Sequence, residues 1–247
     1  MNNRNKNNNN SYWIVGKHAV ESALKNSKRM KYHLCITKEN FASFDLSNLE
    51  IKTDIMSRSE ISTIADNPNT HQGTALLVKP LETNNLNSYL ESNKENKKTF
   101  IILDQISDVR NFGAIIRTAE CTGVDAIIIQ KKGGAPVTGD TVKTSAGAIF
   151  KIPICKVDHI KDAIFYLKAS NITTVSATEK TENIVYDLDL NKPLAIIMGS
   201  EGKGVSKSVL NIVDHRASLP LLGDVNSLNV SVACGAFLYE AIRQRSL

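Results

Sequence analysis

The second half of the chain alternates short apolar runs with stretches whose apolar residues recur every three or four positions. The runs show no apolar–polar alternation, which predicts strands buried on both faces of a largely parallel sheet. The stretches between them predict helices with one buried face. The predicted strands are Phe100–Asp104, Ala126–Ile129, Ile172–Ala177, Ala195–Met198 and His215–Leu219. The predicted helices are Asn111–Cys121, His159–Ser170, Ser206–Ile212 and Asn229–Gln244.

A second, smaller α/β pattern precedes this one. Helical spacing predicts a helix from Lys17 to Leu24, and apolar runs predict strands at Lys31–Thr37 and Gly73–Val78. Ser57 and Glu60 have the spacing of a capping box, which predicts that a helix begins there. We therefore expect a compact α/β module over residues 12–80.

Two polar segments bound that module. Residues 1–11 contain a run of Asn and have nothing to bury, which predicts a disordered tail. Residues 81–98 are polar and charged with few apolar positions, so we predict a linker with about one helical turn. The second domain then extends over residues 99–247.

The composition excludes several classes of protein. The 247 residues and 42% hydrophobic content suffice to bury the cores of one large or two small domains. The four cysteines, Cys35, Cys121, Cys155 and Cys234, are far apart and form no CxxC pair, which argues against zinc and against a disulfide framework. No apolar run is long enough to span a membrane, and the N-terminus has no signal-peptide core. We expect a metal-free cytoplasmic protein.

The net charge of +5 is unevenly distributed. Residues 1–38 contain a single acid, Glu21, and eight bases: Arg4, Lys6, Lys17, Lys25, Lys28, Arg29, Lys31 and Lys38. A basic segment on an otherwise balanced chain indicates a surface that binds a polyanion. A merely solvated basic surface explains the charge equally well.

Three constellations follow predicted strands. In the first, Asn111 and Gly113 open a helix and Arg117 lies on its second turn, just after the strand that ends at Asp104. A helix start after a strand end is where α/β sheets bind ligands, and Arg117 offers a permanent charge and five donors. The alternative is an Asn cap followed by a surface Arg.

The second constellation is the turn from Gly199 to Ser206, with Glu201 inside it. It resembles a phosphate-binding loop, but Val205 follows Gly204 where such a loop requires Lys and then Ser or Thr. The remaining choices are a tight turn with a solvated Glu201 or a loop folded around a small ligand.

The third constellation begins where Leu219 and Pro220 end a strand, because Pro220 cannot donate a hydrogen bond to a neighbouring strand. Asn226, Ser227 and Asn229 then lie at the start of the C-terminal helix. One such residue suffices to cap a helix, so the surplus predicts contact with a ligand. An ordinary capped core helix is the alternative. Each constellation alone is weak evidence, whereas all three in this order are strong evidence.

These motifs resemble a known family. NxGxxxRxA at residues 111–119, GxExxG at 199–204 and PxxGxxxSLNVSVA at 220–233 are similar to the three motifs of the SpoU (TrmH/RlmB) family of RNA ribose 2′-O-methyltransferases. The resemblance covers residues 99–247. Residues 13–80 resemble the ribosomal-protein-like α/β module that binds substrate in RlmB-like members.

The resemblance implies a SPOUT-type α/β fold whose parallel sheet carries a C-terminal trefoil knot, one of the few exceptions to the rule against threaded chains. It implies a homodimer that binds S-adenosyl-L-methionine in the knot. The backbone of Gly199, Leu219 and Leu228 would surround this cofactor. Arg117 matches the catalytic arginine, and the polar residues around it match Asn111, Glu201, Ser227 and Asn229, with Asn111 and Glu201 orienting Arg117.

The implied reaction is attack of a ribose 2′-hydroxyl on the sulfonium methyl group, which requires a positioned hydroxyl and a proton acceptor. Either Arg117 is neutral and takes the proton, or it stays charged and stabilises the alkoxide while a phosphate or water takes the proton. We favour the second account. The expected substrate is a guanosine in 23S rRNA. The alternatives are a tRNA or an adenosine substrate, or a non-catalytic RNA-binding assembly factor.

Overall fold

The computed structural model describes residues 11–27, 29–47, 50–64, 71–81, 83–92 and 98–246. Contacts divide the chain into two compact units. Unit 1 is the described part of Met1–Glu82 together with Val137–Phe150, and unit 2 is the described part of Thr83–Pro136 and Lys151–Leu247. Of the predicted tail over residues 1–11, residues 1–10 lie outside the described residues.

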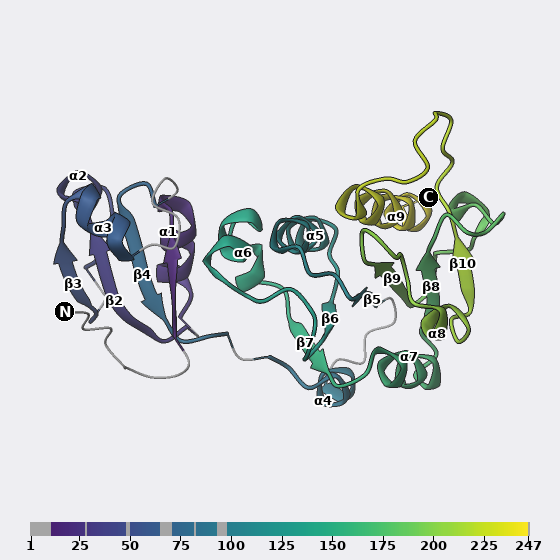
Figure 1. Ribbon diagram of the computed structural model, residues 1–247. Coiled ribbons are helices and arrows are strands. Elements are labelled where there is room, and N and C mark those ends of the chain that lie inside the picture. The colour runs from purple at the N-terminus through teal and green to yellow at the C-terminus, as the bar shows by residue number, and fades with distance from the viewer. Residues whose placement is uncertain are drawn as a thin grey trace. The chain divides into compact units, whose positions relative to one another are not determined.

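Unit 1 is built on a four-stranded mixed sheet with strand order β1-β4-β2-β3, in which only β2 and β3 are parallel (Figure 1). The predicted capping box is confirmed, because Ser57 and Glu60 bond reciprocally at the start of α3. The elements are β1 (Tyr12–Val15), α1 (Lys17–Lys25), β2 (Lys31–Ile36), α2 (Lys38–Phe41), β3 (Lys52–Ile55), α3 (Arg58–Ile64), β4 (Thr74–Val78), α6 (Gly139–Thr144) and the 3₁₀ turn η1 (Ala148–Phe150).

Residues 137–150, which the sequence places in the second domain, pack in unit 1. Gly139 of α6 lies so close to β1 that a Cβ atom there would be 2.6 Å from the carbonyl oxygen of Trp13. At the other end of the segment, the Phe150 ring lies 5.0 Å from the guanidinium carbon of Arg29. Close backbone packing and a cation–π contact therefore attach this segment to unit 1.

Unit 2 contains a six-stranded sheet in which every neighbouring pair is parallel, with strand order β10-β8-β9-β5-β6-β7. The predicted α/β fold with a parallel sheet is confirmed, whereas the trefoil knot stays a prediction. The strands are β5 (Thr99–Asp104), β6 (Ala126–Gln130), β7 (Ile154–Val157), β8 (Thr173–Ala177), β9 (Leu194–Gly199) and β10 (His215–Ala217). The helices are α4 (Leu86–Ser92), α5 (Val109–Cys121), α7 (Ile160–Ala169), α8 (Lys207–Leu210), α9 (Val230–Arg245) and the 3₁₀ turn η2 (Val185–Asp187).

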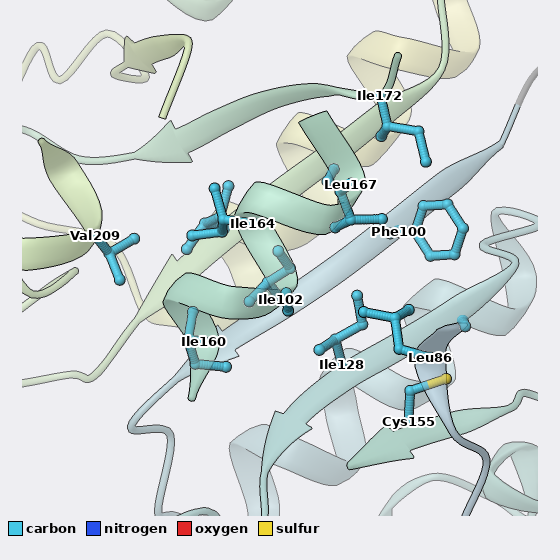
Figure 2. Close-up of a cluster of buried hydrophobic side chains, with 14 of the residues drawn as sticks. Leu86, Phe100, Ile102, Ile128, Cys155, Ile160, Ile164, Leu167, Ile172 and Val209 are labelled. Atoms are coloured by element: carbon cyan, nitrogen blue, oxygen red, sulfur yellow. The ribbon is translucent and has the colours of Figure 1, made fainter. Parts of the chain in front are cut away.

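Helices cover both faces of this sheet, with α5 and α9 on one side and α4 and α7 on the other (Figure 1). Figure 2 shows Phe100 and Ile128 of the sheet among side chains of α4 and α7, including Leu86, Ile164 and Leu167. Burial of both faces explains why β5 and β9 are apolar at almost every position. Helix α4 lies within the segment predicted to be a linker, and its Leu86 and Leu90 are buried in this core.

No helix in the part of the chain that the structure describes is both long and apolar enough to cross a bilayer.

Candidate active site

A tight turn at the carboxyl end of β9 forms the first part of the site. Ser200 and Gly204 bond to each other in both directions, with N···O distances of 3.2 and 2.8 Å, so the chain folds back on itself. A Cβ atom on Gly199 would lie 2.1 Å from the backbone of Gly204 and Val205, which excludes any side chain there. Glu201 is exposed at the tip of this turn.

The turn is fixed to the neighbouring strand. Asp104 is buried at the carboxyl end of β5, directly beside Gly199 in the sheet register. Its carboxylate accepts a hydrogen bond of 2.8 Å from the backbone N–H of Ser206, at the far end of the turn. The carboxyl ends of β5 and β9 therefore form one rigid edge, where α/β sheets usually bind their ligands.

Helix α5 begins two residues earlier than the sequence analysis expected. Asp108 is its N-cap and accepts from the backbone N–H of Asn111 at 2.8 Å. Asn111 is consequently not a cap, and its side chain makes longer-range bonds. Its Nδ2 donates to Glu201 Oε1 at 2.7 Å, and its Oδ1 accepts from Asn229 Nδ2 at 3.0 Å.

Asn229 is the N-cap of α9. Its Oδ1 accepts from the backbone N–H groups of Ser231 and Val232, at 2.9 and 3.4 Å, which leaves its Nδ2 to donate to Asn111. A continuous series of hydrogen bonds, Glu201–Asn111–Asn229, thus joins the three motifs that the sequence analysis identified separately.

A cleft of about 360 Å³ lies next to this series of bonds, at the carboxyl ends of β8, β9 and β10. Five of the predicted site residues line it: Gly199, Glu201, Leu219, Ser227 and Leu228. Asn111, Arg117 and Asn229 do not line it. Asn111 is nevertheless connected to the cleft by its bond to Glu201, and Asn229 is connected through its bond to Asn111.

Arg117 is exposed on α5, six residues or about 9 Å of helix rise beyond Asn111. No hydrogen bond or ion pair joins its guanidinium to another residue in the described ranges. The expectation that Asn111 and Glu201 orient Arg117 is not met in this structure, because these two side chains bond to each other instead.

The cleft also has a wall that the sequence analysis missed. Thr178, Glu179 and Lys180 follow β8 and also line the cleft. They match no motif, but they follow the predicted strand Ile172–Ala177. The rule that ligands bind at the carboxyl ends of parallel strands would have identified them.

The lining suits a nucleoside ligand with charged groups. The glycine turn lies beside apolar side chains of Met198, Leu228 and Phe237, and two carboxylates and two ammonium groups line the same cleft: Glu179, Glu201, Lys180 and Lys203. These residues fit S-adenosylmethionine, whose adenosine can be bound by main-chain atoms between apolar groups and whose sulfonium is a cation. Within the described ranges, no group of three or more His, Cys, Asp or Glu side chains could hold a metal ion.

A parallel α/β unit with a ligand cleft at the carboxyl ends of its strands is the architecture of a cofactor-binding enzyme. Comparison with known proteins identifies the family. The model of the SpoU rRNA Methylase family matches residues 98–239, and the model described as RNA 2′-O ribose methyltransferase substrate binding matches residues 13–84. The chain belongs to the SpoU family, and it is an S-adenosylmethionine-dependent RNA methyltransferase.

Similar sequences support this membership over nearly the whole chain. A Staphylococcus epidermidis protein, named as belonging to the TrmH family of tRNA/rRNA methyltransferases, is 35% identical over 240 residues. The match covers 94% of this chain and 95% of that protein. A Staphylococcus haemolyticus protein of the same name is 34% identical over 239 residues, covering 94% and 95%.

Several solved structures of methyltransferases share the fold of this chain. An AdoMet-bound rRNA methyltransferase from Sinorhizobium meliloti superposes with a TM-score of 0.77 at 26% identity, covering 95% of this chain and 87% of that one. The SpoU methyltransferase AviRb from Streptomyces viridochromogenes, with AdoMet, shares the fold with a TM-score of 0.83 at 21% identity, covering 96% and 91%. The A. aeolicus TrmH/SpoU tRNA modifying enzyme is 30% identical, with a TM-score of 0.56, and covers 65% and 82%.

Proposed function

We propose that the chain methylates the ribose 2′-hydroxyl of a guanosine in 23S rRNA. The observation that carries this proposal is the series of hydrogen bonds Glu201–Asn111–Asn229 beside the cleft. It fixes three turns, from distant parts of the chain, around one pocket. The main chain of Gly199, Leu219 and Leu228 holds the adenosine part of the cofactor, and Ser227 lies within the same lining.

When bound, S-adenosylmethionine supplies an electrophilic methyl group on a sulfonium. The residues of the chain must then hold the ribose hydroxyl about 3–3.5 Å from that methyl group and in line with the bond that breaks. The rigid turn at Gly199 fixes one side of this arrangement, and the cap at Asn229 fixes the other.

Arg117 acts on the RNA side of the reaction. Arg117 is exposed, and its guanidinium offers a positive charge and a planar fork of N–H donors. The charge stabilises the negative oxygen that develops on the ribose, and a phosphate oxygen or water accepts the proton. A neutral Arg117 acting as base is the less favoured account, because deprotonating guanidinium costs more than transferring the proton to a nearby oxyanion.

An rRNA substrate is favoured over tRNA by the share of this chain that each structural neighbour covers. The rRNA methyltransferase from Sinorhizobium meliloti covers 95% of this chain, unit 1 included, whereas the tRNA modifying enzyme from A. aeolicus covers 65%. The match of residues 13–84 to the substrate-binding model supports an RNA substrate that is methylated on its ribose. The alternatives are a tRNA substrate or an adenosine substrate.

Methyl transfer from labelled S-adenosylmethionine to separate 23S rRNA and tRNA preparations tests the proposal, followed by mapping of the modified nucleotide. We expect label in 23S rRNA, at a guanosine whose 3′ linkage resists alkaline hydrolysis because the 2′-oxygen is methylated. Label in tRNA alone, or at a base, overturns it. Methylation of neither RNA also overturns it.

We also propose that the chain is a homodimer and that it acts in the cytoplasm. The loop before α9 and the helix itself expose apolar side chains: Leu222 is 99% exposed, Val225 72% and Val232 56%. Such exposure on one connected segment is typical of a surface that a partner covers. All four cysteines are free thiols, as expected in a reducing compartment. Light scattering coupled to size-exclusion chromatography measures the oligomeric state directly.

A further inference from the structure

Four residues of unit 1 form a row across one face of the four-stranded sheet. Trp13 of β1 pairs with Leu77 of β4, Leu77 pairs with His33 of β2, and His33 pairs with Lys52 of β3. Residues paired in this way project from the same face. We name this set, Trp13–Leu77–His33–Lys52, the aromatic row.

The two rings of the aromatic row lean toward each other. Trp13 and His33 are two strands apart, which separates their backbones by about 9.5 Å. Their ring centroids are nevertheless 5.8 Å apart, with an angle of 56° between the planes. The two rings therefore approach each other across β4.

The imidazole is held in place by a carboxylate. His33 Nε2 lies 2.7 Å from Asp54 Oδ2, and Lys52 Nζ lies 3.4 Å from the same oxygen. Because an ionised carboxylate only accepts hydrogen bonds, Nε2 carries the hydrogen. Nδ1 then has no hydrogen-bond partner within the described ranges, and in the neutral ring it is an acceptor.

Helix α3 covers the adjacent row and leaves the aromatic row partly open. Ile61 of α3 is fully buried against Val15, Cys35 and Ala75. In the aromatic row, Trp13, Leu77 and His33 keep partial exposure, and the Lys52 side chain is 67% exposed. Trp13 packs against this cluster with part of its side chain and leaves the rest exposed.

We propose that the aromatic row is a stacking surface for an unpaired base of the RNA substrate. The Trp13 indole receives the base, His33 Nδ1 accepts a hydrogen bond from it, and Lys52 contacts the adjoining phosphate. Aromatic platforms flanked by cations are the usual means of holding single-stranded RNA. RNA fits better than a protein partner, because residues 1–38 carry eight bases and one acid.

This inference takes from the proposed function only that RNA is the substrate. It adds the surface and the mode of recognition, and it does not depend on which nucleotide is methylated or whether methylation is observed.

The chain itself provides the probe. Trp13 is its single tryptophan, so emission excited selectively from tryptophan reports on the aromatic row. We expect titration with an unpaired RNA oligonucleotide to quench this fluorescence, with the same Kd that fluorescence anisotropy of labelled RNA gives. Binding by anisotropy without any change in tryptophan emission overturns the proposal.

Variants of the full chain separate stacking from other effects. Trp13→Ala is expected to weaken RNA binding about 5- to 100-fold, which is the usual loss of one stacked base. Trp13→Phe keeps an aromatic face and should bind within about threefold of the original chain. Lys52→Ala should lower the slope of log Kd against log salt concentration by about one, which corresponds to the loss of one phosphate contact.

The matched control is Phe41→Ala, which removes another exposed aromatic of unit 1, on α2, and should leave RNA binding unchanged. Unchanged cofactor affinity and circular dichroism establish that Trp13→Ala is folded. Equal RNA affinity of Trp13→Ala, Trp13→Phe and the original chain overturns the proposal, as does an effect of Trp13→Ala on self-association alone. RNA binding that requires Trp13 without any methyl transfer would support this inference while contradicting the proposed function.

Discussion

Asn111 and Glu201, 90 residues apart in the chain, are joined by a hydrogen bond of 2.7 Å between Nδ2 and Oε1. The carboxylate comes from the turn after β9 and the amide from the first turn of α5. The same amide group accepts from Asn229 through its oxygen. Asn111 is therefore the residue on which the relative positions of the three motifs depend.

Replacing Asn111 by alanine removes both bonds and leaves the Glu201 carboxylate without this donor. A hydrogen bond to a charged group contributes about 1.5–3 kcal/mol, so kcat/KM for methyl transfer should fall roughly 10- to 100-fold. Steady-state kinetics with labelled S-adenosylmethionine measures the loss. Asn87→Ala, an exposed asparagine on α4, is the control and should keep full activity. Equal kcat/KM for both variants would show that the two hydrogen bonds of Asn111 do not contribute to methyl transfer.

Two glycines of the same turn differ in what a methyl group would contact. A Cβ on Gly199 would lie 2.1 Å from backbone atoms, whereas a Cβ on Gly202 would have nothing within 4 Å. Overpacking costs about 1–3 kcal/mol or more where backbone must move, so Gly199→Ala should lower the Tm and weaken cofactor binding. Gly202→Ala should stay within about 0.5 kcal/mol of the original stability. Calorimetric unfolding and cofactor titration of the pair test this contrast, and equal behaviour would contradict it.

The inner strands of unit 2 could be predicted because a strand buried on both faces is a short run of apolar residues without apolar–polar alternation. β5 and β9 are apolar at nearly every position, and the sequence analysis placed both within one residue at each end. Three of the four edge strands, β1, β3 and β7, were not predicted, whereas the fourth, β10, was. β7 contains Lys156, and β3 reads Lys-Thr-Asp-Ile, because an edge strand keeps part of its side chains in water.

Five of the predicted site residues line the cleft, but the contacts among the three motifs could not be predicted. Each motif could be recognised in the sequence by its turn residues at the end of a predicted strand. That Asn111 bonds Glu201 rather than Arg117 depends on where α5 begins, and Asp108 decides this by capping the helix. The attachment of residues 137–150 to unit 1 likewise depends on tertiary packing of Gly139, which a local pattern does not encode.

The end of α9 contains a carboxylate, Glu240, whose protonation state should affect the free energy of unfolding. Glu240 is buried and bonds to Arg243 and Gln244, and the bond to Arg243 holds the pKa of Glu240 below its usual value. Gln244 in turn donates to the backbone of Leu188. Since the folded pKa is lowered, the stabilisation is present above the unfolded pKa of about 4.3 and is lost as the pH falls through the folded pKa.

Glu240→Gln should therefore lower the free energy of unfolding by about 1–2 kcal/mol at neutral pH and by less in acid. Urea unfolding at pH 7 and below pH 4 measures both differences. Glu91→Gln on the exposed face of α4 should change neither. A deficit of Glu240→Gln that is equal at the two pH values would show that Glu240 acts through packing alone.

The four thiols should differ in reactivity. Burial raises the pKa of Cys35 and Cys155 to about 11 and that of Cys234 to about 12, whereas Cys121 is exposed on α5. Because the thiolate is the reactive form, we expect one thiol to react quickly with an aromatic disulfide reagent at about pH 8. All four should react in denaturant, and Cys121→Ser should abolish the fast phase. Two or more fast thiols in the native chain would contradict the burial of the other three.

Arg117 provides the sharpest test of the proposed chemistry. Lysine keeps the positive charge but loses the planar fork that can contact two oxygens at once. If the guanidinium stabilises the ribose oxygen in the transition state, Arg117→Lys should lower kcat by about 100-fold or more, with the affinity for S-adenosylmethionine unchanged. Arg110→Lys, on the same helix and also exposed, is the charge-conserving control and should keep activity within about threefold. A lysine variant that remains fast, with a rate that rises with pH as the ammonium loses its proton, would favour a base at this position. It would contradict the charged guanidinium proposed above.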